Sequence, residues 1–200
     1  MVEQETIQPE YVRIGIAGDD AAQKILMKKY FDDFRFSEDQ EAFYGRERAR
    51  FTLNDGKIIF ADFFIISGNL FQNNCMDYVD AVVFVCDLRD EDPLRVVESQ
   101  LNEYFSQRSR ADDAYLTILA LDAENEKETK KGREKVAKLA GKWDIGLGIS
   151  KERGIKEEVN TAIKNAYKHY CNHRKLEVIA FKEHRQNRKK KDNFCSNCQC

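Results

Sequence analysis

Residues 81–86 read AVVFVC, an unbroken apolar run that is rich in valine. Such a run is typical of a strand that is buried on both faces of a parallel sheet. Residues 115–121, YLTILAL, repeat the pattern, and the segment 94–107 between them has its apolar residues at helical spacing. A buried strand, a helix and a second buried strand form the unit from which parallel α/β sheets are built. These two runs therefore decide the fold class.

The segments on either side continue the alternation of strands and helices. The other predicted elements are the strand 11–17, the helix 19–31, the hairpin strands 49–53 and 57–66, the helix 129–141, the strand 143–149 and the helix 155–173. The hairpin prediction depends on the Asp55-Gly56 pair, because this dipeptide between two strand-like runs is a strong turn signal. We therefore expect an α/β fold with a mostly parallel sheet.

Length and composition limit the classes of protein that the chain can belong to. Its 200 residues suggest one domain with a tail, and its net charge of −2 argues against nucleic-acid binding over the whole surface. No apolar run approaches the roughly 20 residues of a membrane span, and the polar, acidic N-terminus does not resemble a signal peptide. We expect a disordered lead at 1–10, one domain at 11–175 and a tail at 176–200.

Charge and cysteine are both concentrated in that tail. Residues 182–192 carry a net charge of +4, so the rest of the chain carries −6. Three cysteines, Cys195, Cys198 and Cys200, fall within the last six residues, whereas the other three are scattered. Scattered single cysteines suggest reduced thiols in the cytosol. Cys86, inside the first buried run, is interpreted as a small buried hydrophobic residue.

A candidate ligand motif follows the first predicted strand. In parallel α/β sheets, ligands bind at the carboxyl ends of the strands, and the sequence GDDAAQKI begins there at Gly18. It resembles the phosphate-binding pattern G-x-x-x-x-G-K-[ST], with Gly18 and Lys24 at the matching spacing. Gln23 stands where a second glycine would let the backbone approach a phosphate, so its side chain is expected to crowd that place. Ile25 stands where the pattern has a hydroxyl.

Over residues 11–173 and at its C-terminus, the chain resembles a small Ras-type GTPase, most closely of the Rab branch. The segments that carry the resemblance follow one another in that family's order, and they are the phosphate-loop region, DGK at 55–57, AVVFVCDLRD at 81–90, YLTILALD at 115–122 and GISKERG at 148–154. The resemblance implies a P-loop small-GTPase-like fold. That fold has a mostly parallel six-stranded sheet with one antiparallel hairpin strand and helices on both faces.

Some of the family's nucleotide-binding residues are retained. By resemblance, Lys24 would meet the β- and γ-phosphates, Asp122 would pair with the guanine base, and Gly68 and Lys151 keep two further family positions. If nucleotide binding is retained, the residues that carry it are Gly18, Gln23, Lys24, Ile25, Gly68, Asp122 and Lys151. Each also has a structural interpretation: a solvated lysine for Lys24, a turn or N-cap residue for Asp122 and a turn glycine for Gly68.

Other family residues are missing. Ile25 and Ile65 occupy positions that the resemblance assigns to Mg²⁺ ligation, yet neither supplies an oxygen. Asn69 replaces the glutamine that orients the attacking water, and the segment 32–48 contains no threonine to cover a γ-phosphate. The aspartates at 19–20 bring negative charge toward the phosphates. We therefore expect weak or lost binding of GTP and GDP, doubtful Mg²⁺ binding, no identifiable catalytic residue and at most a weak GTPase activity.

The tail predicts attachment to a membrane. The terminal Cys198-Gln199-Cys200 resembles the Rab ending that receives two geranylgeranyl groups, so Cys198 and Cys200 are the expected lipidation sites. Two lipid chains anchor a protein stably, and the basic residues 188–191 would add attraction to anionic lipid. Cys195 is either a further palmitoylation site or an idle thiol. The expected location is the cytoplasmic face of an intracellular membrane, together with the cytosol.

Three functions are consistent with these features. The first is a pseudo-GTPase scaffold in vesicle trafficking that holds effector or regulator proteins at residues 32–48 and 67–80 and binds no nucleic acid. The second is a divergent but working GTPase switch. The third, more distant, is a zinc-stabilised nucleic-acid-binding protein. Its His₂Cys₂ metal site would use the helical pair His169 and His173 together with Cys195 and Cys198.

Overall fold

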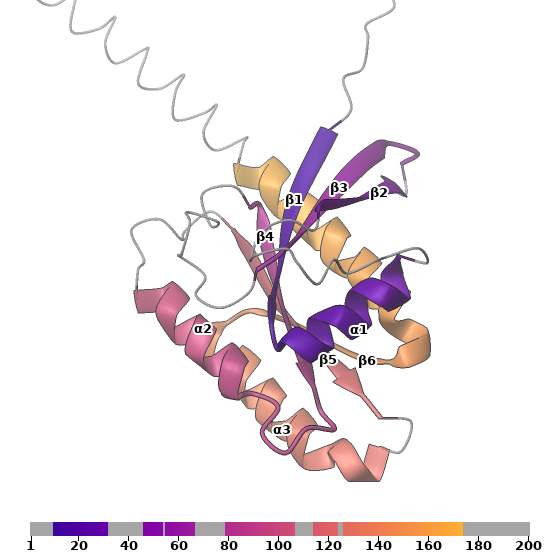
Figure 1. The fold of residues 1–200 in the computed structure, drawn as a ribbon. Coiled ribbons are helices and arrows are strands. Elements are labelled where there is room, and N and C mark those ends of the chain that lie inside the picture. The colour runs from indigo at the N-terminus through magenta and orange to yellow at the C-terminus, as the bar shows by residue number, and fades with distance from the viewer. Residues whose placement is uncertain are drawn as a thin grey trace, which may run out of the picture.

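The computed structural model describes residues 10–31, 46–53, 55–66, 79–106, 114–123 and 126–173. Six of its strands form one sheet in the order β2-β3-β1-β4-β5-β6 (Figure 1). Their bounds are β1 Glu10–Gly18, β2 Arg46–Thr52, β3 Ile58–Ile65, β4 Ala81–Asp87, β5 Tyr115–Asp122 and β6 Gly146–Lys151. All neighbouring strands pair in parallel except β2, which runs antiparallel to β3. The expected α/β fold with a mostly parallel sheet is confirmed.

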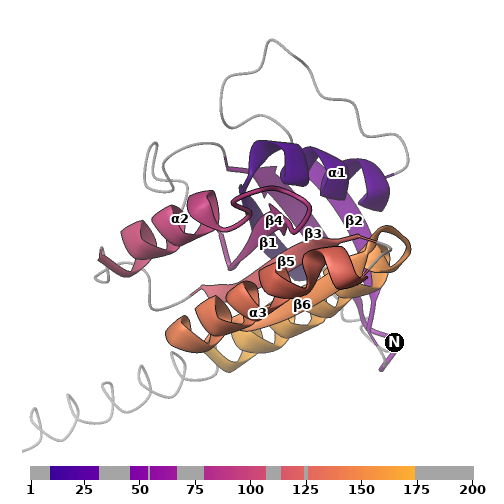
Figure 2. The ribbon, with the colours of Figure 1, turned by 90° about the horizontal axis from the view of Figure 1, so that it is seen from below.

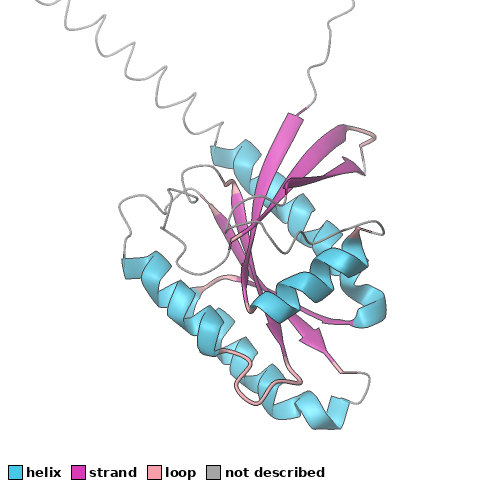
Figure 3. Ribbon diagram, viewed as in Figure 1, coloured by secondary structure: helices cyan, strands magenta, loops and turns pink. Residues whose placement is uncertain are grey.

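Helices cover both faces of this sheet, as Figures 1 and 3 show. The described helices are α1 Asp20–Tyr30, α2 Arg95–Ser106, α3 Glu126–Trp143, and a last one at 155–173. Buried side chains of α2 and α3 pack on one face, whereas those of α1 and the helix 155–173 pack on the other. Figure 2 shows the same layers from below. Among the described residues, no helix combines the length and apolar character needed to cross a membrane.

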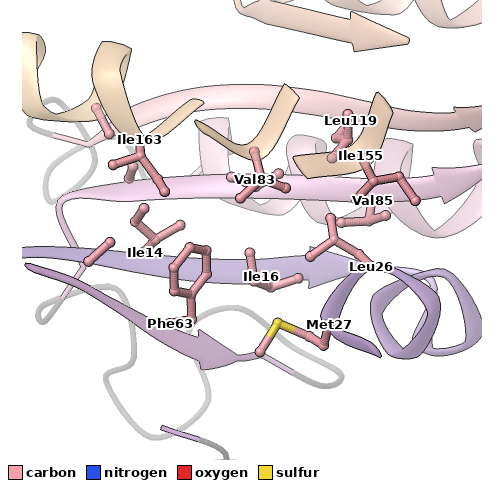
Figure 4. Close-up of a cluster of buried hydrophobic side chains, with 14 of the residues drawn as sticks. Ile14, Ile16, Leu26, Met27, Phe63, Val83, Val85, Leu119, Ile155 and Ile163 are labelled. Atoms are coloured by element: carbon pink, nitrogen blue, oxygen red, sulfur yellow. The ribbon is translucent and has the colours of Figure 1, made fainter. Parts of the chain in front are cut away.

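The core consists of two apolar clusters, one on each side of the sheet. Figure 4 shows the second cluster, in which Ile14 and Ile16 of β1 lie near Leu26 of α1 and Ile163 of the last helix. The central strand β4 is buried along its whole length, as its sequence predicted. Each fully buried aliphatic side chain of this size stabilises the fold by about 1.5–3 kcal/mol. The two clusters therefore stabilise the packing of the helices on both faces of the sheet.

Of two predictions made from local sequence, the hairpin is correct and the start of the last strand is wrong. The hairpin is confirmed, and Gly56 in its turn has a φ of 82°, in the left-handed region that glycine tolerates. The predicted strand 143–149 is wrong at its start, because Trp143 is the last residue of α3 and β6 begins at Gly146. One contact and one backbone angle account for this: the ring centroids of Trp143 and Phe105 of α2 lie 4.3 Å apart, and Asp144, just after the helix, has a φ of 52°.

Several predictions fall outside the described residues. They concern most of the lead 1–10, most of the two partner segments 32–48 and 67–80, Gly68 and the whole cysteine-bearing tail with Cys198 and Cys200. Glu10, which the sequence placed in the lead, is the first residue of β1. The domain boundaries and the lipid attachment remain predictions.

Candidate ligand site at the carboxyl edge of the sheet

Five parallel strands, β1, β3, β4, β5 and β6, end at the same edge of the sheet, which we call the carboxyl edge. β1 ends at Gly18, β4 at Asp87, β5 at Asp122 and β6 at Lys151. Asp122 and Lys151 are register partners, and Gly18 pairs with Val85 of β4. The structure thus brings Gly18, Asp122 and Lys151 to the edge where α/β proteins bind ligands.

The junction between β1 and α1 is very short. β1 continues to Gly18 and α1 starts at Asp20, so Asp19 is the single residue between them. The predicted phosphate-binding segment is therefore helical from Asp20 onward. The backbone N–H of Gln23 donates to the Asp19 carbonyl at 2.9 Å, as in a regular helix. A phosphate cradle instead needs backbone N–H groups that point into a concave loop.

Asp19 is the N-cap of α1. Its carboxylate accepts hydrogen bonds from the backbone N–H groups of Ala21 at 2.9 Å and Ala22 at 3.0 Å. Aspartate is among the preferred N-cap residues because it satisfies amides that have no partner within the helix. The same amides and the helix dipole would attract a phosphate. In this chain, the anion at the start of the helix is the protein's own carboxylate.

Gln23 closes the site from inside. Its side chain is buried, and Nε2 donates to the carbonyls of Gly18 at 3.0 Å and Ile66 at 3.3 Å. These two carbonyls lie at the ends of β1 and β3, so one amide group ties α1 to both strands. Sequence reasoning predicted that Gln23 would crowd this place, and the structure shows what the side chain does there.

Gly18 permits the close approach of β1, β4 and α2. Its φ is 105°, and a Cβ at this position would lie 2.1 Å from the Val85 carbonyl oxygen. Its N–H donates to Oε1 of Gln100 in α2 at 2.8 Å, and both groups are buried. Gln100 was missed by sequence reasoning. The sequence feature that could have identified it is a glutamine on the apolar side of an amphipathic helix, next to Val97 and Leu101.

The other two residues of the predicted phosphate motif face different surroundings. Lys24 is exposed on α1, one turn beyond the start of the helix. Ile25 is half-buried and packs against the core cluster beneath α1. An isoleucine in this place contributes apolar packing and offers no oxygen to a cation.

Asp122 is engaged by its own neighbours. It is buried at the end of β5 and accepts hydrogen bonds from the Ala123 N–H, at 2.9 Å, and from the Thr129 hydroxyl. Arg133 of α3 forms an ion pair with its second oxygen. Thr129 and Arg133 were not predicted, because only the fold of α3 brings them to β5. Lys151 lies half-buried beside Asp122 at the end of β6.

Carboxylates give the carboxyl edge an acidic character. Asp87 forms a two-pronged ion pair with Arg89, and burial together with the charges of Asp87 and Asp19 raises the pKa of Asp90. Burial, and then the same carboxylates, raise the pKa of Cys86 to about 12, so this thiol stays neutral. Its predicted role as a buried hydrophobic residue is confirmed. The field here disfavours polyphosphate.

A hollow of about 550 Å³ lies beside Gly18. Its described charged residues are three carboxylates and one guanidinium, and they are Asp19, Asp20, Glu103 and Arg95. A GTP phosphate chain would meet a net negative lining there, and each such contact at 4 Å could cost up to about 4 kcal/mol at an effective dielectric constant near 20.

The zinc prediction is only partly within the described residues. His169 and His173 lie one helical turn apart with ring centroids separated by 4.4 Å, whereas Cys195 and Cys198 lie outside the described part of the chain. Within that part, no three histidine, cysteine, aspartate or glutamate side chains are grouped so that they could hold a metal ion. Of the four predicted zinc ligands, only His169 and His173 can therefore be placed.

Comparison with known proteins assigns no family to the chain. No protein-family model matches it, and no curated protein matches it significantly.

Proposed function

We propose that this chain is an atypical Rab-like protein with a small-GTPase-like fold and weakened or lost binding of GTP and GDP. It acts as a membrane-anchored scaffold in vesicle trafficking and presents its partner surfaces at residues 32–48 and 67–80. The sheet order β2-β3-β1-β4-β5-β6, with β2 as the antiparallel strand, is compatible with that fold.

The observation that carries the proposal is the bonding of the β1–α1 junction. The carboxylate of Asp19 takes the amides at the start of α1, and the Gln23 amide binds the carbonyls of Gly18 and Ile66. To bind there, a phosphate group would have to displace the Asp19 carboxylate, which is covalently part of the chain. The first turn of α1 would also have to unwind into a phosphate-binding loop. Nucleotide binding is disfavoured by both requirements.

The base-binding position supports the same conclusion. Asp122 already has the Thr129 hydroxyl and the Arg133 guanidinium as partners. Pairing with a guanine would require at least one of these buried interactions to break. Losing a partner of a buried charge is expensive, so the internal ion pair competes well with a base.

The nucleotide content of the freshly purified protein tests this proposal, followed by calorimetric titration with GTP and GDP, with and without Mg²⁺. We expect no co-purified nucleotide and no saturable binding in the micromolar range. Lys24→Ala is the matched control, because it removes the retained family lysine from an exposed position. Tight Mg²⁺-dependent binding that Lys24→Ala abolishes would refute the pseudo-GTPase proposal.

One observation favours the alternative of a working GTPase. Asp122 and Lys151 are register partners at the carboxyl edge, which is the placement that base recognition by this pair would need. If this alternative is correct, the protein releases phosphate from GTP, slowly and in proportion to its concentration. The Asp122→Ala variant would lose that activity, whereas a contaminating GTPase would not respond to it.

Membrane attachment is a separate part of the proposal and depends on Cys198 and Cys200. In eukaryotic cells, we expect the full chain in the membrane fraction and the Cys198→Ser, Cys200→Ser double variant in the soluble fraction. Cys195→Ser is the matched control and should keep the membrane association. Intact-mass analysis should show two isoprenoid groups on the parent chain, and a soluble, unmodified parent chain would contradict this part.

A further inference from the structure

A groove separates α2 from α3 on the face of the sheet opposite to α1, and we call it the α2–α3 groove. Figures 1 and 2 show the two helices on that face. The groove has a volume of about 430 Å³. It shares no described lining residue with the hollow beside Gly18, so it is a distinct surface.

The two sides of the α2–α3 groove carry opposite charges. The α3 side, the basic wall, presents Lys135, Lys138 and Lys142. Their spacing of three and four residues places them on one stripe of the helix. The other side, the acidic wall, presents Asp92, which precedes α2, and Glu98 in the first turn of α2. All five side chains are exposed.

The walls do not neutralise each other within one molecule. Ion pairs between described residues include those of Arg13, Arg48, Lys57, Arg89 and Arg133, and none of these pairs involves a residue of either wall. Lys142 instead places its ammonium group 4.6 Å from the centre of the Trp143 ring. The charged groups of Asp92, Glu98, Lys135 and Lys138 are therefore exposed to a second molecule.

An apolar floor lies between the two walls. Leu94 and Leu139 are buried at its base, and half-buried Trp143 lies at one end, stacked on Phe105 with an angle of 4° between the rings. The Trp143 indole N–H is shielded from solvent and has no hydrogen-bond partner among the described residues. Aromatic residues are enriched at the centres of protein interfaces, and tryptophan is among the residues that contribute most to binding there.

We propose that the α2–α3 groove is the contact surface between two copies of this chain. A dimer with two-fold symmetry uses the same patch on both molecules, so the patch must complement itself. Opposite charges on the two walls meet this condition, because a two-fold axis along the groove places each acidic wall against the basic wall of the other copy. A uniformly acidic or basic partner would match one wall and be repelled by the other.

Because the charges of both walls are exposed, the dimer is expected to be weak. Exposed ion pairs contribute little each and are screened by salt, so the dimer is concentration-dependent and weakens as ionic strength rises. The contact does not depend on nucleotide binding. Dimer formation and nucleotide binding are therefore independent properties of the chain.

A charge-swap experiment on the full chain tests the dimer. One variant reverses the basic wall with Lys135→Glu and Lys138→Glu, and the other reverses the acidic wall with Asp92→Lys and Glu98→Lys. Sedimentation velocity over the micromolar range should show a dimer for the parent chain and an at least tenfold higher dissociation constant for each variant alone. An equimolar mixture of the variants should restore the dimer, because each reversed wall then faces a complementary one.

Two controls keep the result unambiguous. Lys28→Glu with Lys168→Glu reverses two exposed charges on the opposite face of the sheet and should leave the dimer unchanged. Circular dichroism should show the same helix content in all variants, and the milder pair Lys135→Gln, Lys138→Gln replaces the reversal if its helix content falls. A monomeric parent chain would overturn the proposal. So would a dimer that both reversals leave intact, or two monomeric variants whose mixture stays monomeric.

Discussion

At the scale of single residues, Gly18 is the described glycine that has least room for a side chain. Replacing it by alanine would put a methyl group 2.1 Å from a carbonyl oxygen at a φ of 105°. We expect Gly18→Ala to lower the free energy of unfolding by more than about 4 kcal/mol, enough to unfold many single domains.

The matched control for this prediction is Gly56→Ala in the hairpin turn. Gly56 also has a positive φ, of 82°, yet a methyl group there would meet no atom within 4 Å. Backbone strain alone costs about 1–2 kcal/mol in the left-handed region. Urea unfolding of the two variants separates strain from collision, and equal losses would contradict the close approach at Gly18.

Asp19 stabilises the start of α1 through two hydrogen bonds. Removing an N-cap carboxylate typically costs about 1 kcal/mol, so Asp19→Ala should lower the unfolding midpoint in urea correspondingly. Asp20→Ala is the control, because Asp20 follows the cap and interacts with the helix dipole at about 0.3 kcal/mol. A larger loss for Asp20→Ala than for Asp19→Ala would show that Asp19 is not the cap.

Asp90 gives the chain a pH-dependent weakness. Its pKa is raised by burial and by the charges of Asp87 and Asp19, so the folded state binds this proton more tightly than the unfolded state. The charged form therefore destabilises the fold above its folded pKa, and the penalty disappears as the pH falls through that value and below the unfolded one. Because Asp90 is largely exposed, we expect Asp90→Asn to add only a few tenths of a kcal/mol at pH 7.

Urea unfolding at pH 7 and at pH 3 measures this difference. The gain from Asp90→Asn should be present at pH 7 and absent at the lower pH, where the aspartate is already neutral. A gain that is the same at both values would mean that the neighbouring carboxylates do not act on Asp90.

The candidate site was only partly predictable at this scale. The sequence shows that Gln23 replaces a glycine, but its hydrogen bond to Ile66 joins residues 43 positions apart. The bond from Gly18 to Gln100 spans 82 positions. Local patterns contain no information on such pairs, since only the packed sheet brings them together. Asp19 was predicted as a charge near the phosphates, and its hydrogen bonds as a cap became visible only once the start of α1 was known.

At the scale of elements, the junction of β5 and α3 depends on one buried ion pair. Asp122→Asn would keep the shape of the side chain and leave the Arg133 charge without its carboxylate. Breaking such a pair on one side typically costs about 3 kcal/mol or more. We expect a loss of this size in the free energy of unfolding, measured in urea.

A double-mutant cycle with Arg133→Met supplies the control. If the pair acts as described, the double variant is more stable than Asp122→Asn alone, because it contains no partly buried cation without a carboxylate partner. Additive losses in the cycle would mean that Asp122 and Arg133 act independently.

The boundary between α3 and β6 shows where element prediction failed. Residues 143–149 look strand-like because Trp143 and Ile145 are large and apolar at alternating positions. The stacking of Trp143 on Phe105 favours helical structure up to Trp143, and the Ile145 N–H still donates to the Ala140 carbonyl. Contact with a distant helix thus outweighed the local preference.

At the scale of the whole molecule, the architecture was largely predictable. The runs 81–86 and 115–121 are apolar at every position, which is expected only where helices cover both faces of a sheet. The antiparallel pair was signalled by Asp55-Gly56. The strand order was not predictable from the residues alone, since it depends on which helices share a face.

The closed β1–α1 junction predicts the response of the whole fold to ligands. A nucleotide that binds the native state raises its melting temperature by mass action. We expect the melting temperature of this protein to be unchanged by GTP with Mg²⁺, by GDP with Mg²⁺ or by EDTA, as measured by differential scanning calorimetry. A shift of several degrees with either nucleotide would show that the junction opens to bind it.

The β1–α1 junction also bears on how a cell could regulate this protein. A protein that is completed by a diffusible ligand follows the supply of that ligand, and exchange factors or competitors can withdraw it. The Asp19 carboxylate and the Gln23 amide are part of the polypeptide. Their effective concentration at the junction is therefore fixed by the fold and does not vary with the supply of a ligand. Under the proposed function, changes in the cellular supply of GTP and GDP leave this fold unchanged. In that case, the amount of protein synthesised and the compartment to which it is delivered would determine its effect.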